Sequence, residues 1–185
     1  KAIVAGEKPD IAHIHNIFFC ITPSVYLALK EENVPIVQTL HNYRFICERG
    51  TFFKNGAICE KCGDKRFFNS VIGRCWRNSF VLSFLLARIF YEKRNFLKYI
   101  DSFIVLSNFS KLKFIEFGLE ERRLHLKGNF LEIENKENRL DQDYALFIGR
   151  IVDYKGIETL IKAFKLNPLL KLKIIGEGPL KRDLR

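Results

Sequence analysis

Two neighbouring stretches near the end of the chain carry glycines and cations in an order that suits phosphate binding. The apolar run 145–148 is followed by Gly149-Arg150, and Lys155-Gly156 then opens a segment with helical apolar spacing. A second apolar run, 172–175, is followed by G-E-G-P-L. Ligands of parallel α/β sheets bind beyond the carboxyl ends of the strands, where glycine lets backbone N–H groups approach an anion. The predicted diphosphate site consists of Gly149, Arg150, Lys155, Gly156, Gly176 and Gly178.

Three histidines also fall at or near predicted strand ends. His41 follows the predicted strand 35–40, at the same kind of edge. His13 and His15 alternate along a short predicted strand, 11–15. Two histidines alone make a poor metal site, so we interpret His13 and His15 as structural or cleft-lining residues. For His41 the alternative to a site role is a histidine that only caps the end of its strand.

The glycine and cation motifs resemble those of a known enzyme family. The G-R-(x4)-K-G stretch followed by G-E-G-P-L is similar to the start of the nucleotide-sugar domain of retaining glycosyltransferases of family four, which have the GT-B fold. The resemblance implies that Arg150 and Lys155 hold the donor diphosphate. It also gives His41, in H-N-Y-R, a catalytic contact near the donor sugar and phosphates. The pair of glutamates that the family places downstream would lie beyond residue 185.

The implied reaction moves a sugar from a nucleotide-diphosphate donor to a glycan or lipid-linked acceptor, with retained configuration, in the synthesis of surface polysaccharide. Two other interpretations stay open. One is a zinc-stapled basic module that binds nucleic acid, which would explain the cysteines and the charge but not the glycine turns. The other is a truncated, non-catalytic remnant of a glycosyltransferase. On the glycosyltransferase interpretation, no nucleic acid is expected as a partner.

Four cysteines lie in the irregular segment 43–78 with the pattern C-(x11)-C-(x2)-C-(x12)-C. Four thiolates can close a tetrahedral zinc site, and a segment with little apolar periodicity needs a staple. A closed site of this kind is structural, and no catalytic metal is expected. Disulfides and free thiols are the alternatives, and the absence of a visible secretion signal disfavours disulfides. The candidate zinc ligands are Cys47, Cys59, Cys62 and Cys75.

Positive charge is concentrated in the middle of the chain. The formal net charge is +10, and residues 44–100 hold 12 Lys and Arg against 4 Asp and Glu. A local surplus of this size favours a polyanionic partner, and an anionic membrane surface fits the aromatic and basic segment 79–99. That segment carries Phe80, Phe84, Phe90, Tyr91 and Phe96 beside Arg88, Lys93, Arg94 and Lys98. No stretch is long and apolar enough to span a bilayer. We expect a cytoplasmic protein, peripheral at the inner face of the membrane.

Alternating strand and helix signals define the elements that must position these residues. The pattern favours α/β architecture with two Rossmann-like parallel-sheet domains, both incomplete in this chain. The first domain, 1–131, carries the Cys-containing basic insert 43–78; 132–143 is a linker, and 144–185 begins the nucleotide-sugar domain. Ser107 or Asn108 should cap a helix that Gly118 ends. The expected strands are 11–15, 35–40, 103–106, 124–127, 145–148 and 172–175, and the expected helices are 1–8, 23–32, 79–99, 107–117 and 157–164.

Overall fold

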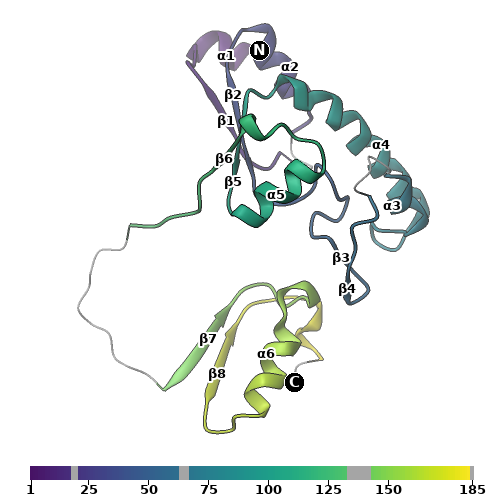
Figure 1. Cartoon of the computed structure of the whole chain (residues 1–185), viewed down its shortest axis with the longest axis vertical. Helices are drawn as coiled ribbons and strands as arrows, with labels where there is room; N and C mark the ends of the chain where they lie inside the picture. Colours follow the sequence, from purple (N-terminus) through teal and green to yellow (C-terminus); the bar gives the residue numbers. More distant parts are fainter. Residues whose placement is uncertain (18–20, 63–66, 133–142, 184–185) are drawn as a thin grey trace. The chain divides into compact units, whose positions relative to one another are not determined.

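The computed structural model describes residues 1–17, 21–62, 67–132 and 143–183 (Figure 1). The chain divides into two compact units, one built from Lys1–Lys54 and Ile58–Phe130 and the other mainly from Leu131–Arg185. Nearly all of the predicted linker 132–143 lies outside the described residues.

A parallel sheet of four strands, in the order β1-β2-β5-β6, forms the centre of the first unit. In register, His13 lies opposite Val37, Val37 opposite Ser102, and Ile104 opposite His125. Because all four strands run the same way, their carboxyl ends form one edge of the sheet (Figure 1). All four predicted strands of this unit are confirmed, and with them its α/β character. Their bounds are β1 (Ala12–Ile14), β2 (Ile36–Leu40), β5 (Ser102–Val105) and β6 (Leu124–Leu126).

Helices connect successive strands, and local capping sets where they begin. The Ser79 hydroxyl accepts a hydrogen bond from the amide of Leu82, at the start of α4. Ser107 and Ser110 bond reciprocally at the start of α5, which confirms the predicted cap, and Gly118 follows that helix with φ 89°. The predicted helix 79–99 ends in a 3-10 turn. The elements are α1 (Ala2–Glu7), α2 (Ser24–Glu31), α4 (Phe80–Phe96), η1 (Leu97–Tyr99), α5 (Asn108–Glu116) and η2 (Glu121–Arg123).

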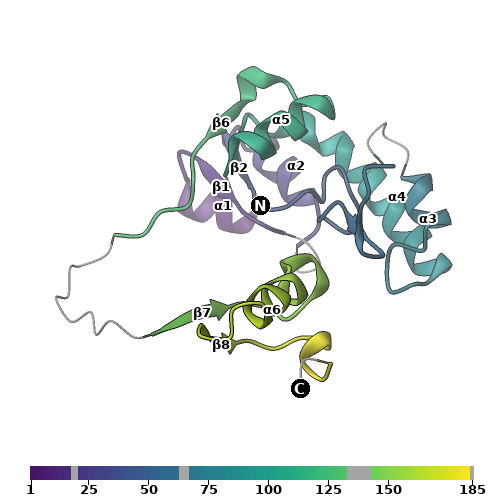
Figure 2. The same cartoon turned by 60° about the horizontal axis from the view of Figure 1, so that its bottom comes forward.

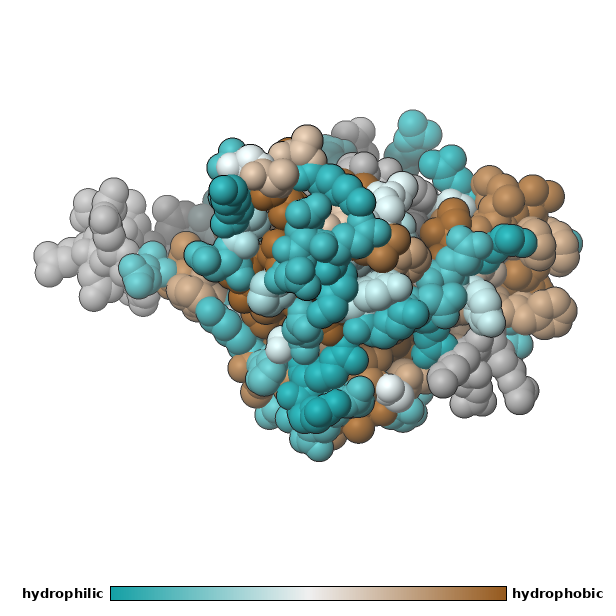
Figure 3. Space-filling view, turned by 90° about the horizontal axis from the view of Figure 1, so that it is seen from above, coloured by the Kyte–Doolittle hydropathy of each residue, from teal (hydrophilic) through white to brown (hydrophobic). Residues whose placement is uncertain are grey.

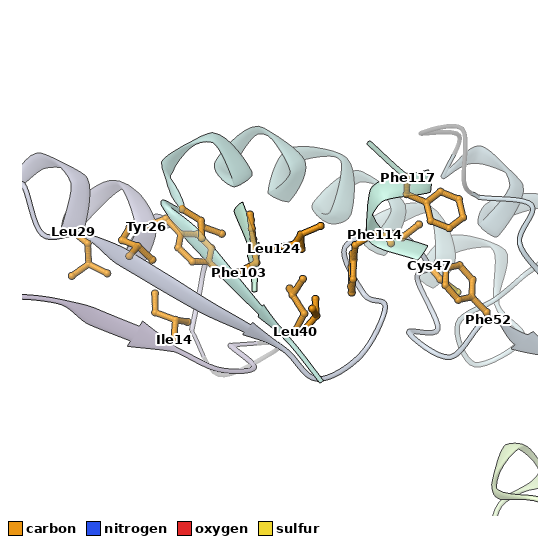
Figure 4. Close-up of a cluster of buried hydrophobic side chains, with 14 of the residues drawn as sticks. Ile14, Tyr26, Leu29, Leu40, Cys47, Phe52, Phe103, Phe114, Phe117 and Leu124 are labelled. Atoms are coloured by element: carbon orange, nitrogen blue, oxygen red, sulfur yellow. The ribbon is translucent and has the colours of Figure 1, made fainter. Parts of the chain in front are cut away.

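The main core lies between this sheet and its helices (Figure 4). Phe103 of β5 is 1% exposed and Phe114 of α5 is 0% exposed. Residues from the insert join the same cluster: the rings of Phe52 and Phe117 stack with their centroids 5.5 Å apart. The insert is therefore part of the core of the first unit rather than a separate module. The labelled members in Figure 4 are Ile14, Tyr26, Leu29, Leu40, Cys47, Phe52, Phe103, Phe114, Phe117 and Leu124.

The prediction that residues 43–78 are irregular is wrong in part. A small hairpin of β3 (Phe53–Lys54) and β4 (Ala57–Ile58) and a short helix, α3 (Phe68–Ile72), lie within it. Helix α3 packs on α4 around a second buried cluster. Such short elements have almost no periodicity of their own, and packing against α4 stabilises α3. The second cluster consists of Phe67, Val71, Leu86, Ala87 and Phe90.

Within the described residues, the second unit contains the predicted pair of parallel strands and, between them, the predicted helix (Figure 2). Ile148 and Ile175 are 71% and 58% exposed, so the two strands leave apolar surface open. The elements are β7 (Tyr144–Ile148), η3 (Asp153–Lys155), α6 (Ile157–Lys165), β8 (Lys171–Ile175) and η4 (Pro179–Lys181).

Candidate functional site

Three histidines gather at the carboxyl edge of the four-stranded sheet. His13 and His15 come from β1 and the residues after it, and His41 directly follows β2. The ring centroids of His13 and His15 are 4.4 Å apart, and those of His15 and His41 are 5.0 Å apart. His15 Nδ1 lies 2.7 Å from His41 Nε2, and His13 Nε2 lies 2.7 Å from the hydroxyl of Thr39. Since β1 and β2 are adjacent and parallel, the fold brings together residues that are 26 positions apart.

The surroundings of His41 favour its neutral form. Partial burial lowers the pKa of His41 below its ordinary value of 6.5, and the nearby His15 and His13 lower that pKa further. A neutral imidazole has one nitrogen that donates and one that accepts a hydrogen bond. Near pH 7, His41 therefore offers a polar contact without a fixed positive charge.

An open hollow lies beside this histidine cluster, between the ends of all four strands. Lys127 lies on its wall with its ammonium 5.6 Å from the centre of the Phe130 ring. The hollow combines a cation, an aromatic face and imidazole nitrogens, which suits a polar ligand such as a sugar or a phosphate. The sequence analysis missed Lys127, because nothing in the local sequence indicates which strand ends share an edge. Its lining consists of His13, His15, Thr39, His41, Ile104, Leu106, Lys127, Gly128, Asn129 and Phe130.

The predicted diphosphate residues of the second unit lie around the ends of β7 and β8 and the start of α6. Arg150 and Lys155 are both exposed, and Arg150 Nη1 donates to the hydroxyl of Tyr154 at 3.3 Å. Gly156 has φ 70°, a conformation that favours glycine, and it precedes the first residue of α6. Gly156 has no side chain that could cap α6, and Arg150 and Lys155 lie in the loop that leads from β7 to this helix start.

The other three glycines of this site hold two loops in contact. A Cβ atom added at Gly176 would collide with the carbonyl of Gly149, and one added at Gly178 would collide with the backbone of Ile151. The amide of Ile151 also donates to the carbonyl of Glu177 at 2.9 Å. The loop after β7 and the loop after β8 therefore touch through main chain. Close backbone approach explains Gly176 and Gly178 here.

The four cysteines of the insert lie in one region as free thiols. Cys47 and Cys62 are buried, and Cys59 and Cys75 are half-buried. Burial raises the pKa of the Cys62 thiol to about 12, and the electrostatic effect of the other three adds to this. Among the described residues, however, no three His, Cys, Asp or Glu side chains are arranged so that they could hold a metal ion. Zinc at these thiols stays a proposal, and binding would require them to move closer together.

A buried carboxylate lies near the thiols. The side chain of Glu48 is 0% exposed, and neither of its oxygens has a hydrogen-bond partner among the described residues. Burial raises the pKa of this carboxyl, while nearby Ser70 lowers it; the Ser70 hydroxyl, however, donates to the Phe67 carbonyl at 2.5 Å. Burial without hydrogen-bond partners favours the neutral, protonated form of this carboxyl. Sequence reasoning missed Glu48, because a single glutamate in a charged segment carries no signal of burial.

Helix α4 presents apolar side chains to solvent, but not all of those predicted. Phe80, Phe84 and Tyr91 are 55%, 54% and 63% exposed, whereas Phe90 is 1% exposed and packs in the second buried cluster. Phe96 is half-buried against the main core. Figure 3 shows hydrophobic surface at the right-hand end of the molecule, where Figure 1 places α3 and α4. No helix of the described residues is long and apolar enough to cross a bilayer.

Comparisons with known proteins agree with this architecture. The family model described as "Glycosyltransferase Family 4" matches residues 1–135, and the one described as "Glycosyl transferases group 1" matches residues 129–185. The two family models together place the chain in the glycosyltransferase class. Because the first match covers well over half of the sequence, the chain belongs to glycosyltransferase family 4. No curated protein matches it.

A solved structure has the same fold. It is a variant of S. aureus TarM in complex with Fondaparinux, alpha-GlcNAc-glycerol and UDP, with a TM-score of 0.50 and 18% sequence identity. The match covers 88% of this chain and 28% of that chain, so the sequence spans little more than a quarter of TarM. The likeness confirms the predicted GT-B type of α/β fold.

Proposed function

We propose that the protein containing this chain is a retaining glycosyltransferase that transfers a sugar from a nucleotide-diphosphate donor to a glycan or lipid-linked acceptor. The observation that carries the proposal is the placement of Arg150, Lys155 and the uncapped start of α6 around one strand end. Two cations and free N–H groups can neutralise a diphosphate as it leaves. Membership of glycosyltransferase family 4 supports the same chemistry.

In this mechanism the diphosphate is the leaving group and an acceptor hydroxyl is the nucleophile. Arg150 and Lys155 stabilise the negative charge that develops on the departing phosphate oxygens. His41, neutral near pH 7, contacts the donor sugar or phosphate through one ring nitrogen. These groups supply the charge stabilisation without a catalytic metal.

Donor titration of the complete protein tests the proposal. TarM was solved with UDP, so UDP is the first probe, with GDP and ADP beside it. We expect calorimetry to show saturable binding of one of these nucleotides, and product NMR to show retained anomeric configuration. An inverted product would contradict the retaining mechanism. Failure of all three nucleotides to bind would contradict the donor site.

The four cysteines are proposed to hold one structural zinc ion. The shared location of the four thiols supports this, and a bound cation would draw the thiols together. Elemental analysis of protein purified under reducing conditions is expected to give about one zinc per chain. Cys59→Ser with Cys62→Ser should remove the metal and expose residues 43–62 to protease. Metal-free wild-type protein would disprove the zinc site.

We further propose that exposed apolar residues of α3 and α4, here called the α3–α4 apolar surface, dock on an anionic membrane. Charge complementarity argues for this occupant, because the segment 44–100 holds 12 cationic against 4 acidic residues. Exposed Arg74 and Arg77 lie between the two helices in sequence. The surface consists of Phe68, Ile72, Phe80, Val81, Phe84, Leu85 and Ile89, each at least 43% exposed.

Sedimentation with liposomes tests this docking surface. The protein should pellet with anionic vesicles at low salt and be released at high salt, since each cation near the leaflet contributes about 1 kcal/mol that salt screens. Phe84→Ser with Leu85→Ser should reduce binding. Leu169→Ser with Leu170→Ser, at apolar positions of the second unit that are more exposed than Phe84 and Leu85, should not. Tight binding to duplex DNA without binding to vesicles would favour a nucleic-acid partner instead.

A further inference from the structure

A buried polar chain ends at the histidine cluster. The hydroxyl of Tyr26 donates to Gln38 Oε1 at 2.7 Å, and Gln38 Nε2 donates to the backbone carbonyl of His15 at 2.6 Å. Tyr26 is 1% exposed and Gln38 is 2% exposed, so both polar groups are held in the core, where Gln38 Nε2 also donates to the Thr39 carbonyl at 2.9 Å. This chain fixes the main chain at His15, just beyond the end of β1.

The side chain of His15 continues the connection to His41. His15 Nδ1 and His41 Nε2 are 2.7 Å apart, so one of the two nitrogens carries a proton and donates a hydrogen bond, and the other accepts that bond. His41 is exposed as a residue and its ring is only partly buried, so packing constrains the orientation of the ring little. The bond to His15 occupies Nε2 of His41 and leaves Nδ1 as the nitrogen available to a ligand.

We infer that His15 is a positioning residue for His41, anchored by the buried Tyr26–Gln38 pair. The inference rests on the proposed role of His41 in donor contact and goes beyond it by naming what orients that ring. In a histidine that binds a metal, the hydrogen-bond partner of the second ring nitrogen fixes the tautomer and the ring orientation. The partner of an imidazole that contacts a substrate has the same effect. His13, which bonds Thr39 instead, has no such link to His41.

The test uses three substitutions at one position in the complete protein. His15→Asn places an amide near the position of Nδ1, His15→Gln places it near Nε2, and His15→Phe keeps a ring without nitrogens. His125→Phe is the control, since His125 lies exposed on β6 outside the cluster. Side-chain ¹⁵N NMR of His41 reports which of its nitrogens carries the proton.

We expect His15→Phe to change the His41 tautomer pattern and to lower kcat by about two- to tenfold, in line with the loss of one hydrogen bond. His15→Asn should restore both the tautomer pattern of His41 and kcat. His15→Gln should restore neither. His125→Phe should leave both at their wild-type values. Tyr26→Phe should shift the His41 signals in the same direction as His15→Phe, but less.

Unchanged His41 signals in His15→Phe would overturn the inference, and so would rescue by Gln rather than Asn. The backbone amide spectrum of each variant establishes that it is folded before the side chains are compared. His41→Ala separates this inference from the proposed function. If that variant transfers sugar at the wild-type rate, the donor role of His41 is wrong, while the ¹⁵N spectra still decide whether His15 orients it.

Discussion

Arg150→Ala and Lys155→Ala, each made in the complete protein, are expected to weaken binding of the donor nucleotide about tenfold to a hundredfold. A charge-assisted hydrogen bond to phosphate contributes roughly 1.5–3 kcal/mol, and each substitution removes one such group. Both side chains are exposed beside the start of α6, so their loss should leave the fold intact. Calorimetric titration with the nucleotide that binds the wild-type protein measures the change.

Lys162→Ala is the matched control for this pair. Lys162 is exposed on the same helix, but it lies in the last turn of α6, away from the uncapped start. Its removal changes the net charge by the same amount and should alter affinity little. Wild-type affinity in both Arg150→Ala and Lys155→Ala would contradict the assignment of the diphosphate site. If Lys162→Ala lost as much affinity as those variants, the effect would be one of net charge and not of a specific site.

Phe114→Ala is expected to lower the free energy of unfolding of the first unit by about 3–5 kcal/mol, the usual result of deleting a buried ring. Phe114 is 0% exposed, and its ring centroid lies 5.7 Å from that of Tyr43 in the insert. The cavity would therefore open between α5, the sheet and the insert. Phe109→Ala, on the same helix but 62% exposed, should change stability by no more than about 0.5 kcal/mol.

Hydrogen exchange of peptides from β5 and α5 measures this effect within the first unit alone. Faster exchange in Phe114→Ala should extend to the peptide around Phe52, because both residues belong to one core cluster. If the insert keeps its wild-type protection while α5 loses it, the two do not unfold together and the insert is the more independent part.

Elements with strong local signals could be predicted from the sequence. Apolar periodicity and the predicted cap at Ser107 set α5 to within one residue at each end, and α4 to within one residue at its start and three at its end. The hairpin and α3 could not be predicted, because residues such as Phe67 and Val71 are ordered by packing on α4. Their stabilisation comes from contacts distant in sequence, which no local pattern contains.

The surface of α4 was assigned in part to the wrong residues for an identifiable reason. The buried stripe of this helix runs through Ser83, Leu86, Ala87 and Phe90. Ser83 makes the stripe look polar in sequence, although its hydroxyl accepts a hydrogen bond from the Trp76 amide at 2.9 Å. When the partner of Ser83 is not known, the sequence pattern assigns Phe90 to the exposed surface of α4.

Some features of the candidate sites could be predicted from the local sequence, and others depend on contacts between residues distant in sequence. Their location at strand ends follows from α/β topology, so the approximate positions of His41 and Arg150 could be predicted. The pairing of His15 with His41 depends on the register between β1 and β2, which the sequence does not state. Neither the burial of Glu48 nor the contribution of Lys127 has a local signature.

The main-chain contact between the loops after β7 and β8 has a consequence for the energetics of donor binding. With Gly176 against Gly149 and Gly178 against Ile151, neither loop can change conformation without displacing the other. The conformational entropy of both loops is therefore lost when the protein folds, and little more should be lost when a ligand arrives. In the proposed role of binding the donor phosphate, preorganised loops of this kind would convert more of each ionic contact into affinity, and Gly176 and Gly178 would matter for entropy as well as for space.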